Sequence, residues 1–397
     1  MSAAAAPRIS PQQLNAMQRG AVLAQAVEMT QQIYTNSFAS GAGTQLLINP
    51  RNVGLIKRFI IIVSGAVKET GGAVDGTVSP LGWSNILSQI TFTDLNNNIR
   101  VQTGGWHLSA LATARHRKPY AGALVEAAYS DGAAPVLDDV VQRYGNNFPV
   151  IVAPQTVPKG SAGNKFRVMF DLPLAYSDDD LRGALYANVV NAVMQIGITV
   201  NPNPFVAAGA DNTFAVTDGG TVALDGNITV TIYQVYLDQL PIGKQGVVLP
   251  ILDLSTVYEL KSTLFSAIVA ANDFPIPYAN FRDFLSTFAV YNSTGIDTNP
   301  GDGSDINYWA LQSANFTNLW KLDPLTAAFN TRQIVGIDMP SAMYYFSHRR
   351  KPISTTQYGN MELILNASAA AAGAYCTVGW EDFALVNTLV QAGSLAG

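Results

Sequence analysis

Short stretches of alternating apolar and polar residues recur along the chain, and they limit its fold more than any other feature. The alternation is clearest in "MQIGITVN" (Met194–Asn201), and it appears again in "KFRVMF" (Lys165–Phe170) and "NITVTIYQVYL" (Asn227–Leu237). Residues two apart lie on one face of a strand, so each stretch predicts a strand with one face in a core. Clusters of Gly, Pro, Asn and Asp separate the stretches, as in residues 201–226. The chain is therefore predicted to be all-β with long loops.

The second half of the chain repeats the order of the first. The stretch "MELILN" (Met361–Asn366) parallels "MQIGITVN", and "AYCTVGWEDFALV" parallels "NITVTIYQVYL"; a strand ending near Pro173 or Pro352 comes before each pair. Two copies of one β unit explain this better than one large sheet, because open sheets rarely exceed about ten strands. The joint falls in residues 240–250, which predicts two Greek-key sandwiches of about eight strands each, at 46–243 and 244–397.

The first 45 residues are predicted to form a separate helical arm. Ser10, Pro11 and Gln13 make a capping box with proline at the first helical position, which predicts a helix from Pro11 to about Ile33. The loose segment "NSFASGAG" then connects this helix to the β region. The predicted helix has a narrow apolar stripe, which favours docking on a partner or another domain. Arg19 is its single basic residue, which gives only weak support for direct lipid binding.

The composition indicates a surface that is covered by other chains. Charged residues make up 13% of the chain, whereas soluble proteins average about 25%. The net charge of −5 provides no basic field for specific nucleic-acid binding. Cys376 is the only cysteine, so no internal disulfide is expected, which fits assembly in a reducing cytosol. The N-terminus lacks a signal-peptide pattern, and the apolar run from Phe59 is too short to span a bilayer and predicts a buried strand.

Three adjacent carboxylates, Asp178, Asp179 and Asp180, are the first candidate site. They could hold a metal, share a proton for acid–base chemistry, or begin a helix. Ser177 and Asp180 match a capping box, with apolar residues in the two staple positions around it. A catalytic acid also needs a second group in a cleft, so the spacing favours a helix start over catalysis.

The three histidines, His107, His116 and His348, lack the spacing of a zinc site. His107 in "GGWHL" is predicted to be a packed sandwich residue. The loop from Asp297 to Asp305 resembles a calcium loop, but Pro300 interrupts it and no glutamate closes it, so a polar loop tip is favoured.

The one basic cluster is Arg349, Arg350 and Lys351. It could contact phosphate or lipid headgroups, although a solvated turn or an intersubunit salt bridge is the more common use of such a cluster. The sequence thus predicts no catalytic, cofactor-binding or metal-binding residues, no cofactor, and no enzyme activity.

Several ordered blocks resemble a known family. They are "GGWHL", "LPLAYSDDDLRGALYANV", "YQVYLDQLPIGKQG", "LPILDLSTVYEL", "YANF", "FLSTFAVY", "DINYW", "ANFTNLWKLDP" and "QYGN". Together they closely resemble the major capsid protein of tectivirus-type phages, which are tailless icosahedral viruses with an internal membrane. The resemblance implies a double jelly roll, two eight-stranded sandwiches that stand upright in the capsid of the virion.

The same resemblance implies how the chain assembles in the host cytoplasm. Three chains would form a homotrimer that acts as a pseudo-hexameric capsomer, and neighbouring capsomers with penton and minor capsid proteins would complete the icosahedral shell. Residues 1–45 would face inward, in possible contact with the membrane, and the 201–226 loop is the candidate for an outward tower.

Two alternatives remain open at this point. A secreted carbohydrate-binding β-sandwich or glycosidase would need a signal peptide and an aromatic platform with paired acids. A virion spike or attachment protein would be far less abundant in particles than a shell protein.

Overall fold

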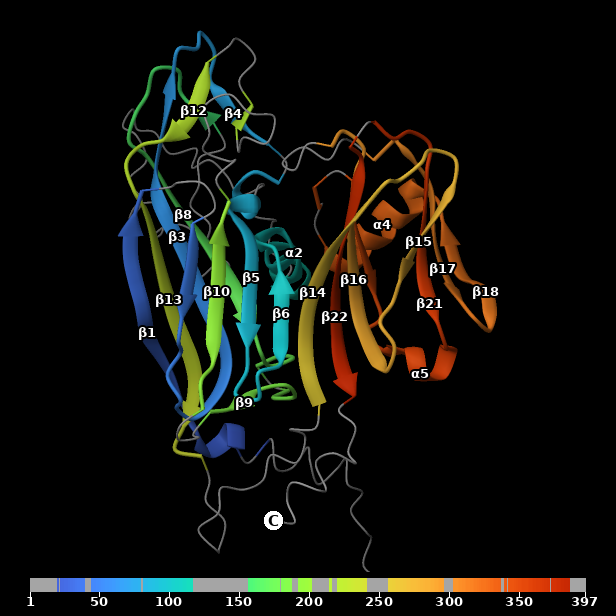
Figure 1. Cartoon of the computed structure of the whole chain (residues 1–397), viewed down its shortest axis with the longest axis horizontal. Helices are drawn as coiled ribbons and strands as arrows, with labels where there is room; N and C mark the ends of the chain where they lie inside the picture. Colours follow the sequence, from blue (N-terminus) through green and yellow to red (C-terminus); the bar gives the residue numbers. More distant parts are fainter. Residues whose placement is uncertain are drawn as a thin grey trace, which may run out of the picture.

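The structure is a computed structural model of the whole chain. It describes residues 20, 22–39, 44–79, 81–116, 156–178, 180–187, 192–201, 214–215, 220–240, 256–295, 303–336, 339–340, 342–371 and 373–385. These residues form two β-sandwiches that stand side by side, with the first half of the chain in one and the second half in the other (Figure 1). They are called the first roll and the second roll below.

One sheet of the first roll carries its longest strands. Its main strands lie in the order β1 (Val27–Phe38), β13 (Ile228–Asp238), β3 (Leu55–Thr70) and β8 (Asn164–Pro173). Two short strands, β9 (Leu185–Tyr186) and β12 (Thr221–Leu224), also pair with β3. All main pairings in this sheet are antiparallel, and the apolar side chains of alternate residues point into the sandwich core.

The facing sheet of the first roll is shorter. Its strands lie in the order β2 (Gln45–Ile48), β10 (Gln195–Val200), β5 (Leu87–Thr93) and β6 (Ile99–Thr103). The short 3-10 helix η1 (Trp83–Ile86) precedes β5, and helix α2 (Gly105–His116) follows β6. A small separate sheet of β4 (Gly76–Val78), β7 (Thr156–Val157) and β11 (Phe214–Ala215) lies beyond one end of the roll (Figure 1).

The second roll has the same plan. One sheet contains β14 (Thr256–Ser266), β22 (Tyr375–Leu385), β16 (Arg282–Asn292) and β19 (Met343–Ser347), with the short β20 (Ile353–Ser354) also paired to β16. The other contains β15 (Asp273–Pro277), β21 (Met361–Ala367), β17 (Ile306–Ser313) and β18 (Phe316–Leu322). Helix α4 (Pro324–Val335) follows β18, and the short α5 (Thr355–Tyr358) follows β20.

Both rolls follow jelly-roll topology. Within the described residues each has eight main strands, and in both rolls the first main strand pairs with the last and the second with the seventh. This confirms the predicted fold, a double jelly roll. The predicted repeat is also confirmed, because β10 and β21 are the seventh strands and β13 and β22 the eighth strands of their rolls.

A single continuous sheet joins the two rolls. Strand β14 of the second roll pairs in parallel with β6 of the first, with Leu260 opposite Val101 and Lys261 opposite Gln102. Helix α2 lies behind this junction, between the two rolls (Figure 1). The hydrophobic core of the first roll continues across it to Phe288 and Tyr345 of the second roll. We call this junction, made of β6 and α2 against β14, β16 and β22, the inter-roll seam.

The predicted N-terminal helix is wrong over its second half. Residues 22–25 form a helical turn, but β1 begins at Val27, runs to Phe38 and pairs along its whole length with β13. The first residues of the supposed loose connection are thus part of a strand. The segment is rich in β-branched and aromatic residues, such as Val27, Ile33 and Tyr34, which favour strands. Residues 11–19 lie outside the described part of the chain.

Candidate functional site

Two of the three adjacent aspartates, Asp178 and Asp180, form ion pairs with two different cationic side chains of the same chain. The Asp178 carboxylate lies 2.8 Å from the Lys57 ammonium group, which also donates to Glu28 at 2.7 Å. Burial would lower the pKa of Lys57, but its two carboxylate partners outweigh burial and raise that pKa. The Asp180 carboxylate accepts two hydrogen bonds from Arg182, one from the side-chain Nε at 2.8 Å and one from the backbone N–H at 3.1 Å. Asp179 lies outside the described residues.

The helix predicted to start at Ser177 is absent from the described residues 180–187. The expected capping hydrogen bond does form, because the backbone N–H of Asp180 donates to Ser177 Oγ at 3.0 Å. The chain then turns at Gly183, whose φ of +85° lies in the left-handed region, and continues into β9. The capping pattern is therefore part of a tight turn between β8 and β9, and no helix follows it in the described residues.

Of the three histidines, His107 and His348 have described side chains, and neither belongs to a group of potential metal ligands among the described residues. His107 lies fully buried in α2, where its Nδ1 is 2.8 Å from Thr103 Oγ1 and its ring packs edge-on against Phe288. This confirms the predicted packed residue, although a helix carries it. Burial lowers the pKa of His107 to about 3 and that of His348 to about 4, so both are neutral at physiological pH. The His116 side chain lies outside the described residues.

The potential calcium loop is largely undescribed, since residues 296–302 lie outside the described part. Among the described residues, no group of three or more His, Cys, Asp or Glu side chains could hold a metal ion. A groove of about 520 Å³ lies between the rolls and is lined by uncharged side chains such as Asn85, Gln102 and Asn292. Such a lining offers hydrogen bonds but no acid or base of ordinary strength.

The basic cluster divides into one half-buried side chain that turns inward and two exposed side chains. Arg350 and Lys351 are exposed, whereas Arg349 turns inward and forms an ion pair within its own chain. The prediction of a solvated turn or an intersubunit salt bridge is therefore wrong for Arg349. Its partner is Glu381, which is fully buried on β22.

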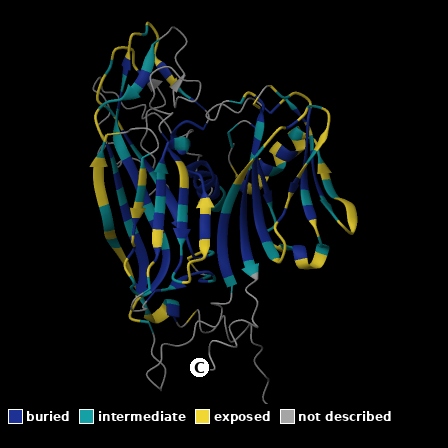
Figure 2. Cartoon of the chain, viewed as in Figure 1, coloured by how far each residue is buried: buried dark blue, intermediate teal, exposed yellow. Residues whose placement is uncertain are grey.

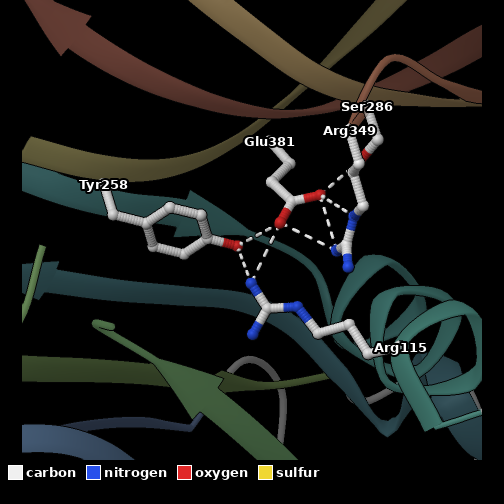
Figure 3. A network of polar contacts seen from close by, with 5 residues as sticks. All are labelled: Arg115, Tyr258, Ser286, Arg349 and Glu381. Atoms are coloured by element: carbon white, nitrogen blue, oxygen red, sulfur yellow. Dashed lines mark hydrogen bonds and ion pairs between the residues drawn. The ribbon is translucent and has the colours of Figure 1, made fainter. Parts of the chain in front are cut away.

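Glu381 is the centre of a polar network that fills the inter-roll seam (Figure 3). Arg349 donates to both carboxylate oxygens from one nitrogen, each at 2.8 Å, and Arg115 from α2 donates to Oε1 at 2.9 Å. The Tyr258 hydroxyl donates to Oε1 at 2.9 Å and the Ser286 hydroxyl to Oε2 at 2.6 Å. Arg115 also donates to the Tyr258 hydroxyl. One carboxylate on β22 thus connects the first roll's helix to β14, β16 and the turn at Arg349 in the second roll.

The two guanidinium groups fix the charge of this network. Burial alone would raise the pKa of Glu381, but Arg349 and Arg115 outweigh burial and hold that pKa at about 2. Burial raises the pKa of the Tyr258 hydroxyl well above its ordinary value, so it stays protonated as a donor. A carboxylate with six donor contacts and no exposed surface has no accessible proton to transfer. The network is built to join the rolls rather than to react.

Asp382, the next residue, points to the opposite face of β22 and joins a second, partly buried cluster. Its Oδ1 lies 2.6 Å from Arg282, which also pairs with Glu259, and Glu259 pairs in turn with Lys261. Burial raises the pKa of Asp382 to about 7 against the opposing effect of Arg282. Neither Glu381 nor Asp382 was singled out from the sequence. The signal was present, since two successive acids interrupt an otherwise apolar and aromatic strand in a chain with few charges.

Comparison with known proteins assigns the family. Residues 3–240 match the family model described as "P3 major capsid protein N-terminal", and residues 255–397 match "P3 major capsid protein C-terminal". The chain is 33% identical over 386 residues to "Major capsid protein P3" of Enterobacteria phage PRD1, covering 96% of this chain and 94% of the relative.

Solved structures share the fold at low sequence identity. A chain in the atomic structure of Sulfolobus Turreted Icosahedral Virus superimposes with a TM-score of 0.63 at 12% identity, covering 90% of this chain and 91% of that one. A chain of the PBCV-1 virus capsid superimposes with a TM-score of 0.54 at 11% identity, covering 90% and 93%. The double jelly roll seen in this chain agrees with the fold of these solved structures, and the two family models together match both of its rolls. The chain belongs to the P3 major capsid protein family and is a structural, non-enzymatic protein of the virion shell.

Proposed function

We propose that three copies of this chain form a homotrimer that serves as a pseudo-hexameric capsomer of an icosahedral shell. The observation that carries the proposal is the inter-roll seam, which holds two similar rolls in one fixed relation. A shared sheet, a continuous core and the Glu381 network all contribute to it. Three such chains supply six similar upright sandwiches, enough for a six-sided building block.

The proposed division of the chain follows the two rolls. We assign residues 46–243 to the first and 244–397 to the second, and add β1 to the first roll because it pairs with β13. The undescribed residues 241–255 separate the last strand of the first roll from the first strand of the second. The N-terminal arm is thereby shortened to the residues before β1.

The ends of the first roll favour an orientation in the shell. The small β4–β7–β11 sheet and β12 lie at one end, and the helical turn of residues 22–25 lies at the other (Figure 1). We assign the first end, which includes part of the 201–226 loop, to the outward tower. The arm would then face the interior and an enclosed membrane.

Contacts with neighbouring capsomers, penton proteins and minor capsid proteins are part of the same proposal. Many weak contacts between capsomers multiply into a stable shell while single errors can still dissociate. Direct membrane contact is proposed for the arm alone. Among the described residues, no helix combines the length and apolar character needed to cross a bilayer.

The test is the oligomeric state of the purified protein. Analytical ultracentrifugation across a dilution series should show a trimer that persists at low concentration, because obligate interfaces of this class bury on the order of 2,000–5,000 Å². A well-folded monomer throughout the series would contradict the proposal. The abundance of the protein in purified particles then separates a shell subunit from a spike.

A further inference from the structure

The two rolls carry equivalent helices at equivalent places. Helix α2 follows β6, the fifth main strand of the first roll, and α4 follows β18, the fifth main strand of the second. Helix α2 packs against β5 and β8, and α4 packs against β17 and β19, which are the matching fourth and sixth strands. Each helix therefore closes the same open side of its own sandwich.

Only one of these helices is covered on its outer face. The second roll covers α2, and residues 106–113 of this helix are all buried. In α4 only Ala327, Thr331 and Val335 are buried, while Leu325 and Phe329 leave 81% and 58% of their surfaces exposed. Figure 2 shows this contrast, with α2 dark blue between the rolls and yellow segments on α4. Two large apolar side chains one turn apart form a ridge that faces solvent in the single chain.

The strand edges show the same contrast. Beside α2, the edge strand β6 pairs with β14. Beside α4, the equivalent strand β18 has no partner on its outer side among the described residues. Strand β1, the equivalent of β14, likewise has an open edge there and lies at the opposite end of the molecule (Figure 1). Its 12 residues contain neither proline nor lysine, the residues that usually protect a free edge.

The sheet behind β1 offers an outward apolar surface. In this sheet Phe59, Ile61 and Ile232 point into the core, so the residues between them point outward. The outward set on three adjacent strands is Ile60, Ile62, Met169 and Tyr233, and their pairing places Ile60 beside Tyr233 and Ile62 beside Met169. Ile62 is already buried among its neighbours, whereas Ile60, Met169 and Tyr233 are half-buried and are available to pack further. The matching face of the second roll is the one that covers α2 through Phe288 and Tyr345.

We propose that one copy of the chain joins the next by repeating its own inter-roll seam. Strand β18 of one copy lies parallel to β1 of the next, and the Leu325–Phe329 ridge of α4 packs on the outward face of the next copy's β13–β3–β8 sheet. A second copy of the chain binds to both surfaces. One end of the chain carries an exposed helix ridge and the open edge of β18, and the other end carries the open edge of β1 and the sheet face on which such a ridge packs. Such a head-to-tail interface forms a closed ring when its repeated rotation completes a full turn. This inference rests on the proposed trimer, which sets the ring at three copies.

The register of the internal seam specifies the register between copies. Leu260 lies beside Val101 in the seam. Strand pairing and the sequence repeat make Gln32 the equivalent of Leu260, and Trp320 the equivalent of Val101. Two residues earlier on each parallel strand, Thr30 and Asn318 should therefore face one another across the interface. Both are exposed in the single chain.

Cysteine cross-linking tests this register directly. The chain's own Cys376 is fully buried, so introduced cysteines should react selectively. The double variant Thr30→Cys with Asn318→Cys should give cross-linked dimers and trimers on a denaturing gel under mild oxidation. Each single variant should stay uncross-linked, because the two residues lie at opposite ends of one chain. Cross-linking of Thr30→Cys alone would instead indicate a two-fold pairing of β1 with β1 and overturn the proposal.

Charge substitutions test the helix ridge. Leu325→Asp and Phe329→Asp should each abolish the trimer while circular dichroism still shows a folded β protein. The matched control is Leu47→Asp, which alters a leucine that is 70% exposed on β2 and should leave the trimer intact. If either ridge variant fails to fold, the cross-linking result decides by itself.

The outcomes separate this inference from the proposed function. A wild-type trimer that gives no Thr30–Asn318 cross-link and survives both ridge substitutions would overturn the seam-repeat interface and leave the trimer standing. A wild-type monomer would overturn both. A trimer that gives the double-variant cross-link and is lost in the ridge variants supports both.

Discussion

Glu381 shows how a buried charge can serve specificity in a structural protein. Its carboxylate is fully buried, and such a charge is tolerated only when opposite charges and hydrogen-bond donors surround it. Arg115 comes from the first roll and Arg349 from the second, so the charge is satisfied only when the two rolls meet in one arrangement. An apolar seam alone would tolerate sliding of one roll against the other.

Replacing Glu381 by glutamine should destabilise the protein strongly. The substitution keeps the shape but leaves two partly buried guanidinium groups without a compensating charge at a fully buried position, which costs about 3–5 kcal/mol of unfolding free energy. Chemical denaturation measured at neutral pH provides the number. The control is Glu362→Gln on β21, a half-buried glutamate outside the network, which should change stability by less than about 0.5 kcal/mol. Equal effects for the two variants would contradict the assigned role.

The same carboxylate should make stability depend on acid pH. The pKa of Glu381 is about 2 in the folded protein against an ordinary value of 4.5, so the folded state keeps it charged where the unfolded chain is protonated. Its stabilisation is fully present above pH 4.5 and is lost as the pH falls toward 2. The loss is on the order of 3 kcal/mol. Thermal unfolding from pH 6 to pH 3 should fall more steeply for the wild type than for Glu381→Gln; parallel curves would exclude this linkage.

Individual polar residues were harder to predict than the pattern that contains them. Arg349 occurs in a run of basic residues, which is typical of a surface turn, and only the fold places Glu381 opposite it. His107 was predicted to be packed because it follows a tryptophan in an apolar context, and its burial in α2 confirms that. Burial could be inferred locally, whereas the identity of a partner 266 residues away from Arg115 could not.

At the scale of elements, strands were predicted better than helices. The alternating stretches within β8, β10 and β13 and their repeats β21 and β22 are strands with the expected face inward. One predicted helix is wrong in its second half and another is absent from the described residues, for different reasons. Strand β1 is a polar edge strand whose pairing with β13 outweighs the helical pattern before it, and the turn at Ser177 has a helical cap without room for a helix before Gly183. A pairing partner distant in sequence decided the first case, and the turn at Gly183 decided the second.

The contact of α2 with β22 should be sensitive to one added methyl group. A Cβ at Gly379 would lie 2.7 Å from the ring of His107, closer than packed atoms allow. Gly379→Ala should therefore push α2 away from the sheet and cost about 1–3 kcal/mol of unfolding free energy. Gly20→Ala is the matched control, since a Cβ there meets nothing within 4 Å, and it should be neutral or slightly stabilising. A neutral Gly379→Ala would show that the seam is not closely packed at this point.

At the scale of the whole molecule, the chain is a tandem repeat with one completed seam and two open half-seams. The completed seam buries α2 and pairs β6 with β14, and the half-seams leave the α4 ridge with β18 at one end and β1 with its sheet at the other (Figure 1). Low charge was the sequence signal for a covered surface, and it could not indicate where the covering chain binds. The repeat itself indicates that location. The internal seam covers α2 and β6, and their equivalents α4 and β18 are uncovered in the single chain.

The most direct test of this account is an electron-microscopy map of the purified oligomer, at a resolution that separates strands. The account predicts a closed ring of six sandwiches from three chains, with β18 of each chain parallel to β1 of the next and α4 enclosed as α2 is. A ring in which the junctions between chains differ in strand pairing from the junction within a chain, or a two-fold dimer joined through β1, would contradict it.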